Sequence, residues 1–426
     1  MAAGWLQRAV PATPRERGAA LWSFAYFFVL LAGYYVLRPL RDQMGIAGGV
    51  KNLPWLFTAT FLTLLAVQPL YGALVARLPR VRFIPIVYHF FALNLALFWL
   101  LLTLGVEKVI VARVFFVWVS VFNLFAVAVF WSFMADLFTA EQGKRLFGFI
   151  GAGGTAGALL GPGVTLWLSK PLGPVNLLIV AAVFLELAVL CVHMIERVAE
   201  RPAQARQEPQ RVGGSAIAGL SELMRSPYLL GVAGWVSLLS FGATVAYFAQ
   251  AHIVAATIHG AAEQTRLFAG IDLAVNLLSL ATQIFITASL LKRFGAGIAA
   301  TALPAVYVLG FTALAAAPVL AVVLALQVAQ RWMNFAVANP ARQLFFTVVG
   351  REEKYKAKNM IDVVVYRGSD ALYGWVYSSL QALGFKLGAI ALCALPVAAG
   401  WVVLSTALGR KQERLAAKMS DAGAQP

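Results

Sequence analysis

The sequence is poor in charged residues, cysteine and histidine. Only 12% of its 426 residues are charged, about half of the ~25% that soluble domains carry. Its two cysteines, Cys191 and Cys393, lie in apolar runs, so no disulfide framework is expected. Its four histidines have no metal-ligand spacing. These shortages argue against a soluble globular domain and a disulfide-rich scaffold, and we expect neither a metal site nor a cofactor.

Long apolar runs fill the chain instead. Hydrophobic residues make up 61% of it, and the mean hydropathy is +0.79. A helix needs about 20 apolar residues to cross a bilayer. Twelve such runs can be marked out, at 19–42, 53–75, 83–104, 108–138, 145–168, 173–195, 227–249, 266–291, 297–317, 319–348, 359–383 and 386–408. We therefore expect an all-α membrane protein with twelve transmembrane helices.

A hydrophilic segment divides these runs into two equal sets. We expect a six-helix half over 1–195, a cytoplasmic linker over 196–226, and a second six-helix half with a basic tail over 227–426. The basic residues within 77–82, after the second apolar run, have a counterpart in the basic residues 292–293, after the eighth run. Two such halves are the layout of major facilitator transporters.

Basic residues are distributed unequally between the two sides of the membrane. Counted loop by loop, 23 lysines and arginines fall on the side of the N-terminus and 6 on the other. Because basic loops stay in the cytoplasm, we expect both termini there and the protein in a bacterial inner membrane. This distribution accounts for the net charge of +16 without a nucleic-acid partner.

Polar residues recur at helical spacing inside four of the runs, which places each set on one helix face. The sets are Tyr34, Arg38 and Arg41; Asp272, Asn276, Ser279 and Gln283; Gln327, Arg331, Asn334 and Arg342; and Tyr366, Asp370, Tyr373 and Tyr377. One interpretation is hydrogen bonding between helices that holds the bundle together. The other, which four stripes together favour, is a water-filled path between the helices.

The middle of the bilayer is the expected place of the substrate site. Arg331 lies about 18 Å into its run, and Asp370 and Asn276 lie at similar depth. A guanidinium suits a carboxylate or phosphate, because its planar fork donates two parallel hydrogen bonds. The alternative is an Arg331–Asp370 ion pair without ligand. The candidate substrate-binding residues are Tyr34, Arg38, Arg41, Arg331, Asn334, Asn276, Arg367 and Asp370.

Charged residues near the helix ends are candidates for gating or coupling. The motif Glu141-x-x-Lys144, followed by Arg145, is repeated as Glu353-x-x-Lys356 in the second half. Pairing between these clusters would hold one access state, whereas the alternative is ordinary solvated charge. The full set of gating or coupling candidates is Asp42, Asp136, Glu141, Lys144, Arg145, Asp272, Lys356, Lys358 and Asp362.

A glycine-rich stretch over 151–157 superficially resembles a dinucleotide-binding loop. It follows no strand and lies in an apolar run, so we interpret Gly153, Gly157 and Gly161, spaced by four, as a face for close helix packing. The sequence contains no phosphate-binding loop, nucleophile elbow or metal cluster. We therefore expect neither an enzyme nor ATP hydrolysis.

Several motifs resemble those of one family. The segment 34–42, YYVLRPLRD, is similar to the first-helix motif of the nucleotide transporter family, the ATP/ADP translocases of plastids and intracellular bacteria. The segments 130–136, FWSFMAD, and 354–364, KYKAKNMIDVV, resemble its fourth-helix region and its Lys-x-Lys-x-Lys…Ile-Asp-Val-Val element. The segment 267–272, LFAGID, is a fainter match to its eighth helix.

This resemblance implies a bacterial relative that exchanges nucleotides, ATP against ADP and phosphate, on a major facilitator fold. It implies substrate or gating roles for Arg41, Glu141, Asp272 and Lys358. The sequence departs from the family's pattern at Pro39, which interrupts the first motif, and at Arg41, where lysine is usual.

The leading hypothesis is a secondary active transporter of an organic anion, with a nucleotide as the first candidate, working by alternating access. The alternative within transporters is a proton-coupled exporter of drugs or metabolites, with Asp272 or Asp370 as its proton site. Outside transporters, a lipid flippase would need a lateral polar groove, and a membrane sensor would need a signalling domain. We expect a monomer whose partners are the lipid bilayer and a small anion.

Overall fold

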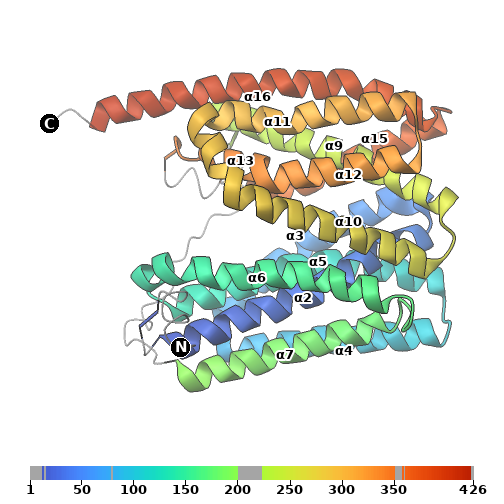
Figure 1. Cartoon of the computed structure of the whole chain (residues 1–426), viewed down its shortest axis with the longest axis vertical. Helices are drawn as coiled ribbons and strands as arrows, with labels where there is room; N and C mark the ends of the chain where they lie inside the picture. The colour runs from blue at the N-terminus through green and yellow to red at the C-terminus, as the bar shows by residue number, and fades with distance from the viewer. Residues whose placement is uncertain are drawn as a thin grey trace. The chain divides into compact units, whose positions relative to one another are not determined.

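The computed structural model contains helices and no strand among the residues that it describes (Figure 1). These residues are 12–13, 16–77, 80–199, 223–350, 357–358 and 360–423, with 69–82, 140 and 420–423 described for the backbone alone. The first half contains α2 (Arg17–Ala47), the 3-10 turn η1 (Val50–Asn52), α3 (Leu53–Arg77), α4 (Arg80–Thr103), α5 (Lys108–Leu137), α6 (Ala140–Leu168) and α7 (Leu177–Val198). The second contains α9 (Pro227–Thr257), α10 (Ala261–Thr282), α11 (Ala288–Ala316), α12 (Leu320–Met333), α13 (Asn339–Phe345), α15 (Tyr366–Ala382) and α16 (Leu387–Gly423). Three π-helical segments interrupt the second half, η3 (Gln283–Thr287), η4 (Asn334–Ala338) and η5 (Met360–Val365).

Ten helical stretches in the described part of the chain are long and apolar enough to cross a membrane. One of them, Ala261–Ala316, has 56 residues, which is about 84 Å of helix and enough for two crossings. The two crossings meet at Gly295, whose φ of +72° breaks the helix inside the expected loop 292–296. η5 and α15 supply the remaining crossing. The expected fold class, an all-α membrane protein of twelve helices in two sets of six, is confirmed; the side on which the termini lie stays a prediction.

Contacts divide the chain into two compact units. Unit 1 contains Met1–Gly49, Leu62–Gln210 and His259–Leu273, and unit 2 contains Val50–Phe61, Arg211–Ile258 and Ala274–Pro426. Each unit thus includes the start of one helix from the other half of the sequence, α10 in unit 1 and α3 in unit 2. Most of the expected linker, residues 200–222, lies outside the described residues.

The same packing scheme occurs in both units. In unit 1, α2 packs against α5, α6 and α7, and α4 packs against α7. In unit 2, α9 packs in the same way against α12, α15 and α16, and α11 packs against α16. Each of these helices of unit 2 lies six spans after the helix of unit 1 that makes the corresponding contacts. The helix pairs therefore repeat, as the weak sequence echoes between the halves led us to expect.

A face of glycines brings α6 against α2 in unit 1. A Cβ atom added to Gly153, Gly157 or Gly161 would overlap a backbone carbonyl oxygen of α2, that of Phe24, Phe28 or Ala32 respectively. No side chain fits at these three positions without moving a helix. The packing interpretation of the glycine spacing is confirmed.

Replacing Gly157 with alanine is expected to lower the thermal stability of the protein, because the added methyl group must push α6 away from Phe28. Overpacking of this kind costs about 1–3 kcal/mol. The matched control is Gly163→Ala on the same helix, where an added Cβ meets nothing within 4 Å. Melting curves of the two purified variants should differ, with only Gly157→Ala destabilised; equal melting temperatures would contradict the tight α2–α6 contact.

The tenth span is not one regular helix, since α12 continues through η4 into α13. Pro340 in the first turn of α13 has no N–H to offer the carbonyl of Ala336. The N–H of Asn339 bonds to the oxygen of Asn334, five residues back, so the carbonyl of Phe335 also lacks its usual α-helical donor. A proline within the span thus accounts for the π-helical segment.

Side chains of η3 supply the missing donors. Gln283 Nε2 donates to the oxygen of Phe335 at 3.0 Å, and Thr287 Oγ1 donates to the oxygen of Ala336 at 2.8 Å. Side chains of the first broken helix therefore complete the backbone hydrogen bonding of the second. For Gln283, the structure supports the interpretation of the polar stripes as links between helices.

Candidate functional site

Two groups of polar side chains contain the main candidate residues, one group in each unit. The Arg38 cluster in unit 1 consists of Tyr34, Arg38, Arg41 and Asp42 of α2 with Asp272 of α10. The Asp370 cluster in unit 2 consists of Arg367, Asp370 and Tyr373 of α15 with Ser237 and Ser240 of α9.

The first cluster is built around a buried ion pair. Arg38 Nη1 lies 3.7 Å from Asp272 Oδ1, and the two side chains are 15% and 1% exposed. Arg38 Nε is buried and has no hydrogen-bond partner among the described residues. Because a well-formed charge-assisted hydrogen bond measures about 2.7–2.9 Å, this pair is loose. The guanidinium therefore has N–H groups that can donate hydrogen bonds to a second anion.

Other charged groups in unit 1 bond along α2. Arg41 donates from Nε and Nη2 to Asp42 Oδ1, at 3.0 and 2.7 Å. The Arg38 cluster thus contains two guanidiniums and two carboxylates. Arg113 of α5 donates from Nε to a backbone carbonyl at the end of α2, at 2.8 Å, and adds a third guanidinium there.

The second cluster is built around Asp370. Ser240 Oγ donates to Asp370 Oδ1 at 2.6 Å, and Arg367 Nη1 lies 3.3 Å from Asp370 Oδ2. Ser240 is fully buried and Asp370 is 7% exposed. Ser237 Oγ lies 3.0 Å from the hydroxyl of Tyr373. A hydroxyl and a guanidinium thus both bind this carboxylate.

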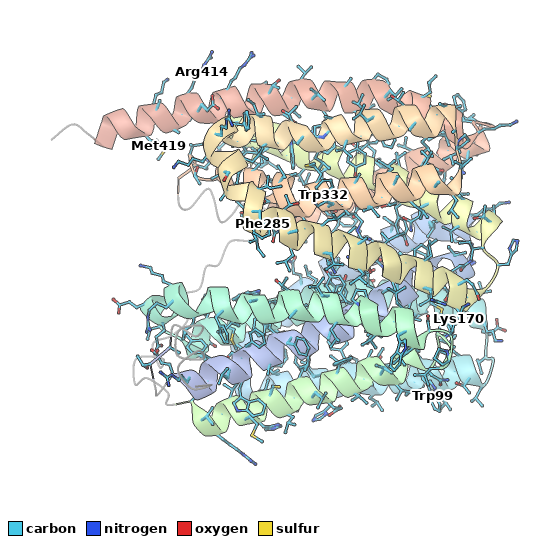
Figure 2. The ribbon with its side chains drawn as sticks, viewed as in Figure 1. Trp99, Lys170, Phe285, Trp332, Arg414 and Met419 are labelled. Carbon is cyan, nitrogen blue, oxygen red and sulfur yellow. The ribbon has the colours of Figure 1, made fainter. Side chains whose placement is uncertain are left out.

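Arg331 and Asn334 lie where α12 passes into η4, and both side chains are partly exposed. Asn334 Oδ1 is buried and has no hydrogen-bond partner within the described ranges. Trp332, labelled on α12 in Figure 2, donates its indole N–H to Thr282 Oγ1 at 2.8 Å. Asn276 lies one turn after Asp272 on α10 and is 9% exposed. π-helical segments often occur at functional sites, which keeps Arg331 and Asn334 as candidates.

Most gating candidates have local partners in the structure. Arg342 Nη1 lies 2.8 Å from Asp362 Oδ1, and Lys358 Nζ donates to Gln343 Oε1 at 2.7 Å. Lys356 lies outside the described residues. Asp362 and Lys358 therefore tie α13 to the start of the eleventh span.

At the start of α6 the structure adds a partner that the sequence did not suggest. Arg145 Nη2 lies 3.0 Å from Glu16 Oε1, and Gln142 Nε2 donates to the same oxygen at 2.8 Å. Burial favours the neutral form of Glu16, but hydrogen bonds from Thr13, Gln142 and Arg145 outweigh it and lower the pKa of Glu16 to about 2. Glu16 therefore stays ionised at neutral pH and joins the N-termini of α2 and α6.

The remaining first-half gating candidates, Asp136, Glu141 and Lys144, have exposed side chains. The residues expected to pair with them, 353–356, are outside the described part of the chain. The cytoplasmic gate thus stays a prediction.

Sequence reasoning missed several residues of unit 2. Tyr307 of α11 donates to Gln330 Oε1, and Gln330 Nε2 donates to Gln327 Oε1, both at 2.8 Å. A single tyrosine in an apolar run gives no periodic signal. Ser237 and Ser240 of α9 could have been found, because with Thr244 they recur at i, i+3 and i+7 on one helix face.

Solved structures of transporters resemble this fold at low sequence identity. A bacterial homologue of the iron transporter ferroportin in an inward-facing state matches with a TM-score of 0.65 and 10% identity. A bacterial homologue of the human lysosomal transporter Spinster matches with a TM-score of 0.59 and 12% identity, and a variant of the nucleoside transporter NupG with 0.55 and 15%. Each match covers 94% of this chain and 99% of the other. At such identities the likeness establishes the fold alone.

Comparison of the sequence with known families gives one match over most of the chain. No curated protein matches the sequence. The model of the Major Facilitator Superfamily matches residues 18–354, from the start of α2 to beyond α13. This range includes Arg38, Asp272 and Arg331. The chain therefore belongs to the Major Facilitator Superfamily, and it is a multi-pass membrane protein.

Proposed function

We propose that the protein is a secondary active transporter of an organic anion, and that the anion is a nucleotide exchanged in the manner of ATP for ADP. The observation that carries this proposal is the Arg38 guanidinium, buried in a loose pair with Asp272 and with an Nε that has no hydrogen-bond partner in the described residues. A buried charged donor of this kind is costly unless an anion completes its hydrogen bonding.

The chemistry around Arg38 suits a phosphorylated aromatic cargo. Tyr34 and Tyr35 lie next to it on α2, with their ring centres 5.2 Å apart, and the guanidinium is 5.8 Å from the Tyr35 ring. Aromatic faces stack on nucleobases without a fixed pattern of hydrogen bonds. A guanidinium beside such rings can hold a phosphate bidentately. The sequence motif over 34–42 supports the same cargo.

Charge in unit 2 agrees with an anionic cargo. The spans from α12 to α15 carry Arg331, Arg342 and Arg367 against only Asp362 and Asp370 within the described residues. Guanidiniums therefore outnumber carboxylates by one in these spans. A bound anion would balance this excess in a membrane-embedded protein.

The test is exchange in proteoliposomes that contain the purified protein. Vesicles preloaded with unlabelled ADP should take up labelled ATP faster than vesicles without internal nucleotide. ATP should also raise the melting temperature of the protein, since a ligand that binds the folded state stabilises it. Adenosine and inorganic phosphate serve as competitors that separate base recognition from phosphate recognition. Absence of both exchange and a melting shift with nucleotides would overturn the proposed cargo.

A further inference from the structure

A ladder of polar side chains follows the contact between α9 and α15 in unit 2. Ser240 pairs with Asp370, 130 residues later, and His252 pairs with Gln381, 129 residues later. This nearly constant offset shows that the two helices run parallel and in register. The positions between the two pairs therefore face each other along about three turns of helix.

The two hydroxyls in the middle of the ladder are buried and incompletely bonded. Thr244 lies one turn beyond Ser240, and Tyr377 one turn beyond Tyr373; each is 1% exposed. Neither hydroxyl has a hydrogen-bond partner among the described residues. A buried polar group without a partner costs about 1–3 kcal/mol. Water or a transient proton carrier at these hydroxyls would remove that cost.

The far end of the ladder is a histidine that is fixed by hydrogen bonds. His252 Nδ1 lies 2.8 Å from the oxygen of Phe248, so Nδ1 carries a proton. Gln381 Nε2 donates to His252 Nε2 at 3.1 Å, and the ring centre of Tyr377 lies 5.8 Å away. Imidazole is the side chain best suited to exchange protons near neutral pH. His252 is partly exposed and lies in the last two turns of α9.

The groups around Asp370 suit a carboxylate that takes up and releases a proton. Arg367 of its own helix pairs with it, and Ser240 of α9 donates to it. Tyr307 of α11 interacts electrostatically with Asp370 and with Tyr366 of α15. When Asp370 is ionised, Arg367 is neutralised by it. When Asp370 is protonated, Arg367 loses this counter-charge and is available to an anion.

From this geometry we infer that Asp370 is a proton-binding site, and that His252, Tyr377, Thr244 and Ser240, with water between them, conduct the proton along the α9–α15 contact. The proton enters at His252 and ends on a carboxylate oxygen of Asp370; no other bond changes. Transport is then coupled to protons, with a proton and an anion taken up together. This coupling rests on the proposed anionic cargo, whereas the proton site itself does not.

The first experiment needs no cargo. Infrared difference spectra of the purified protein between alkaline and acidic buffer should contain the carbonyl band of a newly protonated carboxyl group. Asp370→Asn should remove that band, while a cooperative melting transition shows that the variant remains folded. A band unchanged in Asp370→Asn would overturn the proton site.

The second experiment measures proton flux with a pH-sensitive dye inside proteoliposomes. An inward gradient of ATP, or of inorganic phosphate, should acidify the lumen. Asp370→Asn should reduce acidification to the level of protein-free vesicles. Thr244→Val and Tyr377→Phe should slow acidification, and Thr312→Val, an exposed threonine of α11 that bonds only within its own helix, should not.

The outcomes separate this inference from the proposed cargo. If the infrared band depends on Asp370 but nucleotides neither exchange nor bind, the proton site holds and the cargo proposal fails. If nucleotides exchange while neither the band nor acidification depends on Asp370, the cargo proposal holds and the proton inference is wrong. Equal slowing of acidification by Thr244→Val and Thr312→Val would contradict the path along α9 and α15.

Discussion

Arg38→Ala is expected to abolish anion exchange and to destabilise the protein. The substitution removes the buried guanidinium that we propose binds the cargo. It also leaves Asp272, 1% exposed, without the cation that lies 3.7 Å away. Breaking a buried ion pair by removing one member costs about 3–5 kcal/mol. Labelled ATP uptake into ADP-loaded vesicles and the melting temperature measure the two effects.

A charge-neutral double variant separates binding from stability. Arg38→Met combined with Asp272→Asn removes both charges and fills a similar volume, so most of the lost stability should return. Exchange should remain absent, and ATP should no longer shift the melting temperature. Arg38→Lys keeps the charge but not the planar fork and should bind the anion weakly. Exchange restored in the neutral double variant would show that Arg38 has only a structural role.

Arg331→Ala should weaken cargo binding by about 1.5–3 kcal/mol, the scale of one hydrogen bond to a charged group. At 1.4 kcal/mol per tenfold change, this is roughly a 10- to 150-fold loss in affinity. Arg331→Lys should restore only part of it, because an ammonium cannot make two parallel contacts with a phosphate. The apparent affinity for ATP in the exchange assay is the quantity to compare.

The control for Arg331 is Arg293→Ala, which removes an exposed arginine at the turn between the two helices of Ala261–Ala316. It changes the net charge equally but leaves the membrane-embedded residues intact. Affinity should be unchanged in this variant. If both variants bind ATP equally well, Arg331 does not contact the cargo, and the binding residues must be sought in the Arg38 cluster.

The partners of the candidate residues were harder to predict than the residues themselves. The stripe 272–283 runs from α10 into η3, and its members have different partners. Asp272 pairs with Arg38 in unit 1, whereas Gln283 completes the hydrogen bonding of Phe335 in unit 2. Periodicity identifies a face and gives no information about the helix that it meets. The change of unit between Leu273 and Ala274 was therefore invisible in the sequence.

The Asp370 cluster also shows that periodicity does not identify the partner of a residue. Tyr366, Asp370, Tyr373 and Tyr377 were expected on one face of the eleventh span, and Asp370 and Tyr373 both contact α9. Their hydroxyl partners in α9 were overlooked because serines are common in membrane helices and bear no charge. A search for polar residues at i, i+3 and i+7 in every span would have found Ser237, Ser240 and Thr244 together.

The sequence by itself determined the number of membrane-crossing segments, the division into two sets of six and the glycine face of α6. These are local properties: a bilayer selects about 20 apolar residues at a time, and a spacing of four places small residues on one side of a helix. Only the tertiary structure decided that Asp272 pairs with Arg38 and that Glu16 pairs with Arg145. It also decided that Ser240 and His252 both lie on the contact between the parallel helices α9 and α15. The physical reason is that these pairs join residues 129 to 234 positions apart, and their meeting depends on helix packing, which follows from the shapes of whole helix surfaces.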